Sequence, residues 1–323
     1  MLLHADALWI LLGALALDAL VGDPAALWRR LPHPVAAIGA AIGWLDRRLN
    51  RETWSAATRR RAGVAALAIL VGAGFASGFL VESLLRRLPA GEWFVALAAS
   101  VFLAQRSLYD HVARVRDAFA VGGLAAARAA VSMIVGRDPD SLDEAGVCRA
   151  AIESCAENFS DGVVAPAFWF ALLGLPGLIA YKAVNTADSM IGHRTPRHEA
   201  FGWAAARFDD VLNVCPARLS GVLVALAGPV AGGQPLRAFR TMGRDARKHR
   251  SPNAGWPESA MAAALALALA GPRRYGARRV DDPFLNPEGR PTATPGDIAR
   301  ALRVLVAASV LHAGLYAALA LIL

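Results

Sequence analysis

Residues 62–85, AGVAALAILVGAGFASGFLVESLL, form an apolar run long enough to cross a bilayer, because a spanning helix needs roughly 20 such residues. Blocks of similar or slightly shorter length occur at about 5–22, 93–108, 163–184, 211–231 and 301–323. Ala and Leu dominate them, and alternating β-branched runs are absent, which predicts helices. We therefore predict an all-α, polytopic integral membrane protein with about 4–6 membrane segments.

The composition supports this class. Of 323 residues, 56% are hydrophobic and 19% charged, whereas a soluble domain is about 45–50% apolar and about 25% charged. Disordered, coiled-coil and fibrous classes are excluded. The net charge is +8, but the basic residues lie mostly between apolar blocks, which argues against nucleic acid as a partner. Cys148, Cys155 and Cys215 form no CxxC pair, so we expect reduced thiols and no structural zinc.

The basic loops predict the orientation. Residues 28–61 carry eight arginines and residues 232–300 carry twelve basic residues, against two in residues 86–92. The positive-inside rule places the first two segments in the cytoplasm and the third outside. We expect one membrane domain, 1–323, in the cell (inner) membrane, with 109–162 and 232–300 as larger cytoplasmic segments and a cytoplasmic active face.

Block 163–184 is interrupted by Gly174-Leu175-Pro176-Gly177. It is either a plain span or a re-entrant hairpin with buried irregular backbone, and the hairpin would require 211–231 to dip and return as well. Residues 260–270 are too short to span and predict a core or interfacial helix. Residues 271–297 are rich in Pro, Gly and Arg and predict a polar loop.

The stretch 131–162 carries the first polar constellation. Ser141 and Glu144 have capping-box spacing, so a helix should begin near Leu142 and end at Gly162. One face of that helix should carry Arg149, Glu153, Glu157 and Asp161. A solvated, ion-paired face is one interpretation. The helix leads directly into an apolar block, however, and charge at a membrane boundary is costly unless paired or used. The neighbouring amide of Asn158 suits metal or substrate contact.

The second constellation lies in 181–218, where one helical face should carry Lys182, Asn185, Asp188 and Ser189. The adjacent acids Asp209 and Asp210 repel one another unless a cation or arginine lies near. They suit a divalent metal with oxygen ligands, or simply ion pairs with Arg207.

Two further stretches are polar. Asp18, Gly22-Asp23-Pro24 and His33-Pro34-Val35 lie near the amino end, where His33 is either structural or functional. Residues 249–259 form a donor-rich turn with Arg250 and Asn253, which suits phosphate or lipid headgroups. The sequence contains no P-loop, no G-x-G-x-x-G, no HExxH and no G-x-S-x-G.

Together these stretches resemble the adenosylcobinamide-phosphate synthase family, the membrane enzymes of cobalamin (vitamin B12) biosynthesis known as the CobD/CbiB type. The resemblance runs from about residue 15 to about residue 320, in the family's order. It is carried by Gly22-Asp23-Pro24, His33-Pro34-Val35, Val135-Gly136-Arg137-Asp138, 150–162, 185–190, 206–219 and 251–259. Departures are small: Ala187 replaces an expected Leu, His193 and His198 replace commoner residues, and the loop at Gly276-Ala277 is poorer in glycine.

The resemblance implies an ATP- and Mg²⁺-dependent ligase. It would join a carboxylate of adenosylcobyric acid to (R)-1-aminopropan-2-ol phosphate, or to the free amino alcohol, through an activated acyl phosphate. Implied partners are the corrinoid, aminopropanol phosphate, the lipid bilayer and other enzymes of the pathway. A transporter and a membrane-bound sensor or regulatory relative without ligase activity are the alternatives.

This chemistry needs metal ligands, phosphate-binding cations and a base. The expected metal ligands are Glu157, Asp161, Asp209 and Asp210. The expected catalytic residues are Glu153, Glu157, Asp161, Lys182 and Asp188, with Glu153 or Asp188 as the base. The expected substrate-binding residues are His33, Arg149, Asn158, Asn185, Ser189, Arg207, Arg250 and Asn253; together with Lys182, three of these arginines would hold phosphate. The carboxylates could instead bind corrinoid amides.

Overall fold

The computed structural model describes residues 4–135, 139–275 and 278–323. The chain forms two compact units. Unit 1 comprises Met1–Ala104, Ala165–Asn213 and Tyr316–Leu323, and unit 2 comprises Gln105–Val164 and Val214–Leu315. The expected motif at 136–138 and the dipeptide at 276–277 lie outside the described residues.

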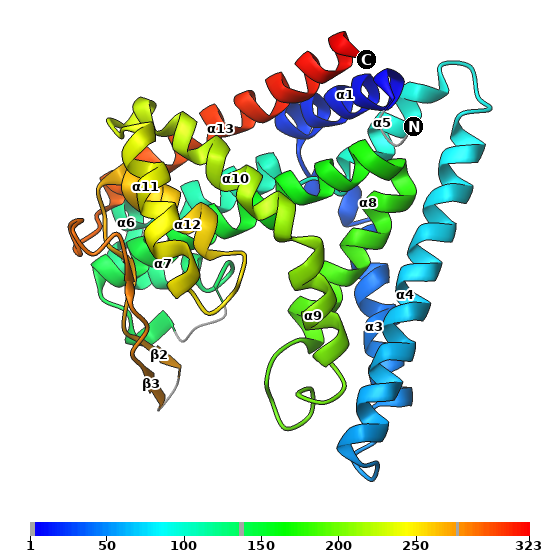
Figure 1. Cartoon of the computed structure of the whole chain (residues 1–323), viewed down its shortest axis with the longest axis horizontal. Helices are drawn as coiled ribbons and strands as arrows, with labels where there is room; N and C mark the ends of the chain where they lie inside the picture. The colour runs from blue at the N-terminus through cyan, green and yellow to red at the C-terminus, as the bar shows by residue number, and fades with distance from the viewer. Residues whose placement is uncertain (1–3, 136–138, 276–277) are drawn as a thin grey trace. The chain divides into compact units, whose positions relative to one another are not determined.

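Helices dominate both units (Figure 1), which confirms the predicted all-α class. Helical stretches long and apolar enough to span a membrane are Ala56–Leu85, Glu144–Ile191, Val214–Ala231 and Pro295–Ile322. This agrees with the predicted polytopic membrane protein, whereas the sidedness of the loops stays a prediction.

Unit 1 is built from helices in the amino-terminal third of the chain and from the α8–α9 segment. Its helices are α1 (Ala5–Val21), α2 (Ala25–Trp28), α3 (Pro34–Leu49), α4 (Ala56–Leu85), α5 (Gly91–Ser100), α8 (Ala165–Ile191) and α9 (Trp203–Leu212). The expected block 93–108 is not one helix, because α5 ends at Ser100 and the next helix begins at Gln105.

A stripe of small residues brings α4 and α8 close together. The buried positions of α4 are Gly63, Ala66, Leu70, Gly74 and Gly78. At Gly78 an added Cβ would lie 2.6 Å from the Cα of Pro176 on α8. Lipid offers no hydrophobic force to press spanning helices together, so close backbone approach along small residues is how such helices pack.

Helix α8 breaks at Gly174, which has φ 67° and ψ −156°, a region open to glycine and costly for other residues. The helix changes direction there (Figure 1). The amide of Leu175 donates to Glu82 Oε2 at 2.9 Å, and Arg86 pairs with Glu82 at 2.8 Å. The predicted break is thus confirmed as a bend capped by a carboxylate.

Unit 2 surrounds a buried helix. Its helices are α6 (Gln105–Val131), α7 (Glu144–Phe159), α10 (Val214–Ala227), α11 (Pro235–Asp245), α12 (Gly255–Leu265) and most of α13 (Pro295–Ile322). Every residue of α12 except Trp256 is buried. The core helix predicted at 260–270 is confirmed only for 260–265, because α12 ends at Leu265 and residues 269–270 form a strand. The expected polar loop contains short strands: β2 (Arg273–Tyr275) pairs with β3 (Arg278–Val280), and β4 (Phe284–Leu285) pairs with β1 (Leu269–Ala270).

Helix α7 begins close to the predicted Leu142, but the predicted cap Ser141 and the predicted end Gly162 were wrong. Asp143 is its N-cap, and the Asp143 side chain accepts a hydrogen bond from the amide of Gly146 at 2.7 Å. Ser141 instead ends a 3₁₀ turn. Gly162 lies in a π-helical turn, Ser160–Val164, followed directly by α8. Aspartate caps as well as serine does, so the sequence offered two cap positions and the local backbone selected the later one.

Candidate functional site

The C-terminal half of α8 and helix α9 bring a cluster of acids and amides together within unit 1. We call it the aspartate cluster, and its members are Asn185, Asp188, Asp209, Asp210 and Asn213. The indole of Trp169 on α8 donates to the carbonyl of Leu212 at the end of α9. The two helices that carry the cluster are therefore also joined beside it.

Asp209 is the most enclosed acid of the cluster, with 8% of its surface exposed. Its carboxylate accepts hydrogen bonds from Asn185 Nδ2 at 3.3 Å and from Asn213 Nδ2 at 2.9 Å. The Tyr181 hydroxyl in turn donates to Asn213 Oδ1 at 3.0 Å. Asn213 is thereby held with its amide nitrogen toward the acid, so the orientation of Asp209 is set by a chain of buried partners.

The surroundings of Asp209 change its acidity. Burial and the nearby charge of Asp188 raise the pKa of Asp209 to about 7, although the hydrogen bonds from Asn185 and Asn213 act in the opposite direction. Burial also raises the pKa of Asp210, while Arg207 at 3.7 Å opposes the rise. Carboxylates that share a site ionise together only when a cation joins them, and strongly shifted acids of this kind concentrate at functional sites.

Gly192 leaves room for the second acid. A Cβ at this position would lie 2.0 Å from Asp188 Oδ1. The amide of Gly192 donates to the carbonyl of Asp188 at 2.7 Å, so the chain turns tightly against the carboxylate. A glycine after the helix thus permits the Asp188 side chain to occupy its present position.

The other residues of α8 that were expected in the site lie along one turn-by-turn row of the helix. Ser189 donates its hydroxyl to the carbonyl of Asn185 at 3.0 Å, and the carbonyl of Lys182 accepts the hydroxyl of Thr186 at 2.7 Å. Lys182, Asn185 and Ser189 lie on one face, as their spacing predicted. Substrate contact by Ser189 stays a prediction, because its hydroxyl is engaged with the helix backbone here.

Unit 2 holds the acids expected on α7. Arg149 Nη1 donates to the carbonyl of Pro291 at 2.7 Å. Glu153 is buried, and its Oε1 accepts the amide of Ala270 at 2.8 Å, which ties α7 to β1. This structural contact competes with the expected role of Glu153 as a base.

The next turn of α7 is more accessible. Glu157 and Asn158 are exposed, and Asn158 Nδ2 donates to the carbonyl of Ser154 at 2.9 Å. Asp161 lies in the π-helical turn. The expected metal set is therefore divided between the units, Glu157 and Asp161 in unit 2 and Asp209 and Asp210 in unit 1.

The 249–259 turn is organised around α12. Asn253 Oδ1 accepts Arg218 Nη1 at 2.7 Å, and the Arg218 guanidinium lies 4.7 Å from the centre of the Trp256 ring. Arg250 pairs with Asp282 at 2.7 Å. Arg250 would have to exchange this partner to bind phosphate.

His33 is the N-cap of α3. Its Nδ1 accepts the amide of Val35 at 3.1 Å, and its Nε2 lies 3.5 Å from Asp23. This arrangement matches the structural interpretation of His33.

Within the described residues, no three His, Cys, Asp or Glu side chains converge to hold a metal ion. Mg²⁺ in nucleotide-dependent enzymes is commonly held by one or two carboxylates together with substrate phosphates and water. The adjacent Asp209 and Asp210, whose pKa values are both raised by burial, fit that type of site rather than an all-protein cage.

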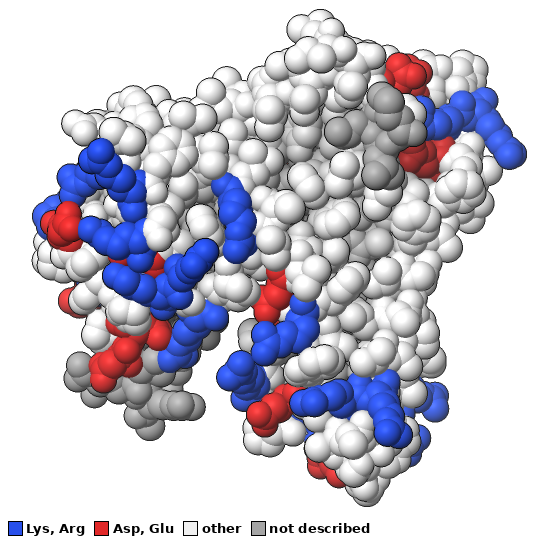
Figure 2. Space-filling view, in the orientation of Figure 1, with Lys and Arg blue, Asp and Glu red and all other residues white. Residues whose placement is uncertain are grey.

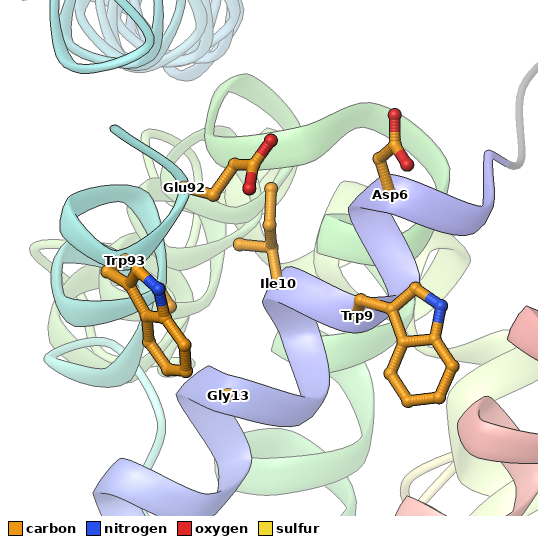
Figure 3. A pocket seen from close by; sticks show the side chains of 7 residues that line it. Asp6, Trp9, Ile10, Gly13, Glu92 and Trp93 are labelled. Atoms are coloured by element: carbon orange, nitrogen blue, oxygen red, sulfur yellow. The ribbon is translucent and has the colours of Figure 1, made fainter. Parts of the chain in front are cut away.

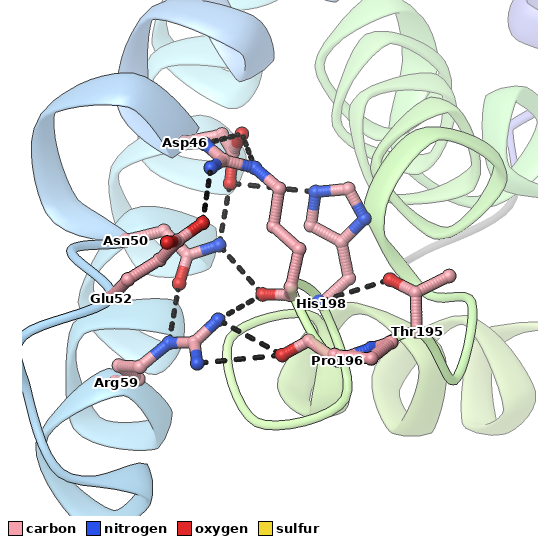
Figure 4. A network of polar contacts seen from close by, with 8 residues as sticks. Asp46, Asn50, Glu52, Arg59, Thr195, Pro196 and His198 are labelled. Atoms are coloured by element: carbon pink, nitrogen blue, oxygen red, sulfur yellow. Dashed lines mark hydrogen bonds and ion pairs between the residues drawn. The ribbon is translucent and has the colours of Figure 1, made fainter.

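Sequence reasoning missed a second polar network in unit 1 (Figure 4). Asn50 Nδ2 donates to Asp46 Oδ1 at 2.7 Å and to the carbonyl of Arg197 at 2.9 Å, while Arg59 Nε donates to Asn50 Oδ1 at 2.7 Å. Arg197 pairs with Asp46 at 2.8 Å, and His198 lies 3.6 Å from the same carboxylate. The spacing of Asp46 and Asn50 by one helical turn could have indicated that they contact each other. Nothing in the sequence indicated that Asn50 also contacts Arg197, 147 residues away.

Comparison with known proteins decides the family. The family model described as CobD/Cbib protein matches residues 11–305. The chain belongs to the CobD/CbiB family. A relative from Sinorhizobium sp, named cobalamin biosynthesis protein CobD, is 52% identical over 318 residues, which cover 98% of each chain.

Other CobD/CbiB relatives agree. Proteins of the same name from Brucella anthropi and Rhodobacter capsulatus are 52% and 50% identical, and cover 96% and 90% of this chain and 95% and 90% of their own lengths. No solved structure matches the chain. The expected family is therefore confirmed, and the chain is a cobalamin biosynthesis family protein with the helices of a membrane protein.

Proposed function

We propose that this CobD/CbiB protein is an adenosylcobinamide-phosphate synthase. It would form the amide between adenosylcobyric acid and (R)-1-aminopropan-2-ol phosphate or the free amino alcohol. Family membership supports the pathway, and the aspartate cluster supports the reaction type. The observation that carries the proposal is the buried Asp209, whose pKa is raised to about 7 by burial and by Asp188.

The cluster offers what amide formation needs. The attacking amine must lose a proton, and a carboxyl group that changes charge near neutral pH can accept it. The amides of Asn185 and Asn213 fix the orientation of the Asp209 carboxylate, so the acceptor is preorganised. Asp188 is the second candidate for this role, because Gly192 holds no side chain against it.

We further propose that Asp210 holds Mg²⁺ together with phosphate oxygens and water, which leaves the Asp209 carboxylate able to accept the proton, and that Lys182 and Arg207 attract phosphate. When bound, ATP and Mg²⁺ would supply the phosphoryl group that activates the substrate carboxylate and the charge that offsets the phosphates. Arg207 is exposed beyond its contact with Asp210, so it can reach a ligand.

The test is product formation by purified protein in detergent with adenosylcobyric acid, aminopropanol phosphate, Mg²⁺ and ATP, followed by mass spectrometry. Asp188→Asn and Asp209→Asn should each lower the rate at least about a hundredfold, the typical contribution of general base catalysis. The matched control is Asp110→Asn, an exposed acid of α6 paired with Arg106, which should keep the wild-type rate.

The outcomes separate function from site. Product from wild type and from all three variants would keep the ligase and refute the cluster as its catalytic site. Absence of product from folded wild-type protein, with every component present, would refute the ligase proposal and favour a regulatory member of the family.

A further inference from the structure

One end of unit 1 carries a concentration of arginines without carboxylate partners. We call it the basic end, and it comprises Arg47, Arg48, Arg51, Arg60, Arg61 and Arg194. Within the described part of the chain, none of these six forms an ion pair with an acid, whereas Arg197 pairs with Asp46. A set of unneutralised charges this dense attracts an anionic partner.

The polar network described above gathers these charges into one surface. Asn50 lies just after α3. Its side chain accepts a hydrogen bond from Arg59 of α4 and donates one to the carbonyl of Arg197. The end of α3, the start of α4 and the 192–202 turn are therefore joined. Figure 2 shows basic side chains gathered over this part of unit 1, at the bottom of the view.

Tryptophans intermixed with the arginines indicate what kind of anion covers this surface. Trp44, Trp54 and Trp203 are exposed. The Arg60 guanidinium lies 4.9 Å from the centre of the Trp203 ring, and that of Arg48 lies 6.0 Å from the centre of Trp44. Tryptophan is enriched where a membrane protein passes from hydrocarbon to headgroups, because its ring is apolar and its N–H is polar. Mixed arginine and tryptophan thus match lipid headgroups better than a soluble anion.

The length of α4 matches that placement. Its apolar stretch, residues 62–85, spans roughly 36 Å at 1.5 Å per residue, slightly more than the hydrocarbon thickness of about 30 Å. Arg61 therefore lies at one boundary of the bilayer when Arg86 lies at the other.

The opposite end of unit 1 carries mainly acidic or ion-paired side chains. Arg86 is paired with Glu82 there, and a hollow between α1 and α5 is lined by Asp6 and Glu92 together with Trp9 and Trp93 (Figure 3). Both ends thus carry tryptophans, but among the described residues six unpaired arginines gather at the basic end, whereas the opposite end has the single unpaired Arg87 after α4. The difference between the ends is one of charge.

We propose that the basic end of unit 1 binds the headgroups of anionic phospholipids. The arginines contact the lipid phosphates and the tryptophans lie at the level of the glycerol region. This end of unit 1 is thereby held in a negatively charged membrane leaflet. The proposal is independent of the ligase reaction.

The test uses the full-length protein, delipidated in a maltoside detergent. Short-chain phosphatidylglycerol or phosphatidylcholine is added, and bound lipid is counted by native mass spectrometry. We expect the anionic lipid to bind at least about tenfold more tightly. Arg47→Gln and Arg61→Gln should each weaken phosphatidylglycerol binding about fivefold, the effect expected for one basic residue at an anionic surface. The matched control is Arg87→Gln, an exposed arginine at the opposite end, which should leave binding unchanged.

Equal affinity for the two lipids would overturn the proposal, as would an Arg87→Gln effect as large as that of Arg61→Gln. Displacement of phosphatidylglycerol by millimolar inorganic phosphate would show a site for a soluble anion and would also overturn it. The melting temperature of each variant without lipid shows that it is folded, so a loss of binding reports on the surface itself.

Discussion

Replacing single glycines of α4 by alanine tests the close contact between α4 and α8. The Cβ of Gly78→Ala would lie 2.6 Å from the Cα of Pro176 and 2.7 Å from the carbonyl oxygen of Leu175. These are backbone atoms that cannot rotate away, so the helices must separate by about 0.8 Å to reach ordinary contact. Overpacking of this kind costs about 1–3 kcal/mol.

Replacing glycine by alanine also stabilises a helix by about 1 kcal/mol. The control must therefore be another glycine-to-alanine substitution in the same helix. Gly72→Ala is that control, because nothing lies within 4 Å of its Cβ. Gly74→Ala should be intermediate, since its nearest neighbour, the Cα of Ala180, lies at 3.2 Å. The difference between Gly78→Ala and Gly72→Ala then reports packing alone, about 1–3 kcal/mol.

The measurement is unfolding of the detergent-solubilised protein as the mole fraction of a denaturing detergent rises. The expected order of stability is Gly72→Ala, then Gly74→Ala, then Gly78→Ala. Equal stability of Gly72→Ala and Gly78→Ala would refute the close approach of the two backbones. Activity should follow the same order, because α8 also carries the aspartate cluster.

Three further predictions concern polar groups. Gly192→Ala should displace the Asp188 carboxylate, which the new Cβ would overlap, and lower the ligase rate at least about tenfold. The melting temperature should fall as well, because the same Cβ would lie 2.6 Å from the carbonyl oxygen of Asp188. Partner hydrogen bonds outweigh burial and hold the pKa of Asp245 at about 2. This lowering supplies about 2 kcal/mol of stability near neutral pH, lost as pH falls from about 4 toward about 2; the melting temperature of Asp245→Asn should be less pH-dependent below pH 4. Asp46→Asn should remove the ion pair with Arg197 and lower stability by about 1–2 kcal/mol, measured by thermal unfolding.

Apolar length and glycine placement predicted most of the helices. The run at 62–85 is the apolar part of α4, and the glycines and proline at 174–177 lie at the bend of α8. Helix ends were harder, because both Ser141 and Asp143 can cap a helix and hydrophobicity does not distinguish them. The block at 93–108 was misjudged for a similar reason, since apolar residues continue through the turn after α5.

The candidate site was predictable only where its partners are close in sequence. The helical face of Lys182, Asn185 and Ser189 follows from spacing. The contact between Asn185 and Asp209 depends on how α9 folds back on α8, and the role of Tyr181 depends on its reaching Asn213 from the neighbouring helix. Tertiary packing decides such contacts, and a single sequence does not record it.

The bend of α8 has a consequence for how the protein is made. Glu82 meets Leu175, a residue that leaves the ribosome roughly 5–20 s later at ordinary translation rates. During that interval α4 enters the membrane with its glycine stripe facing lipid and its carboxylate without the α8 amide. Arg86, one helical turn away, pairs with Glu82 at 2.8 Å and lets α4 carry its own counterion into the bilayer. We therefore expect nascent α4 to require an insertase or chaperone that shields it until α8 is synthesised.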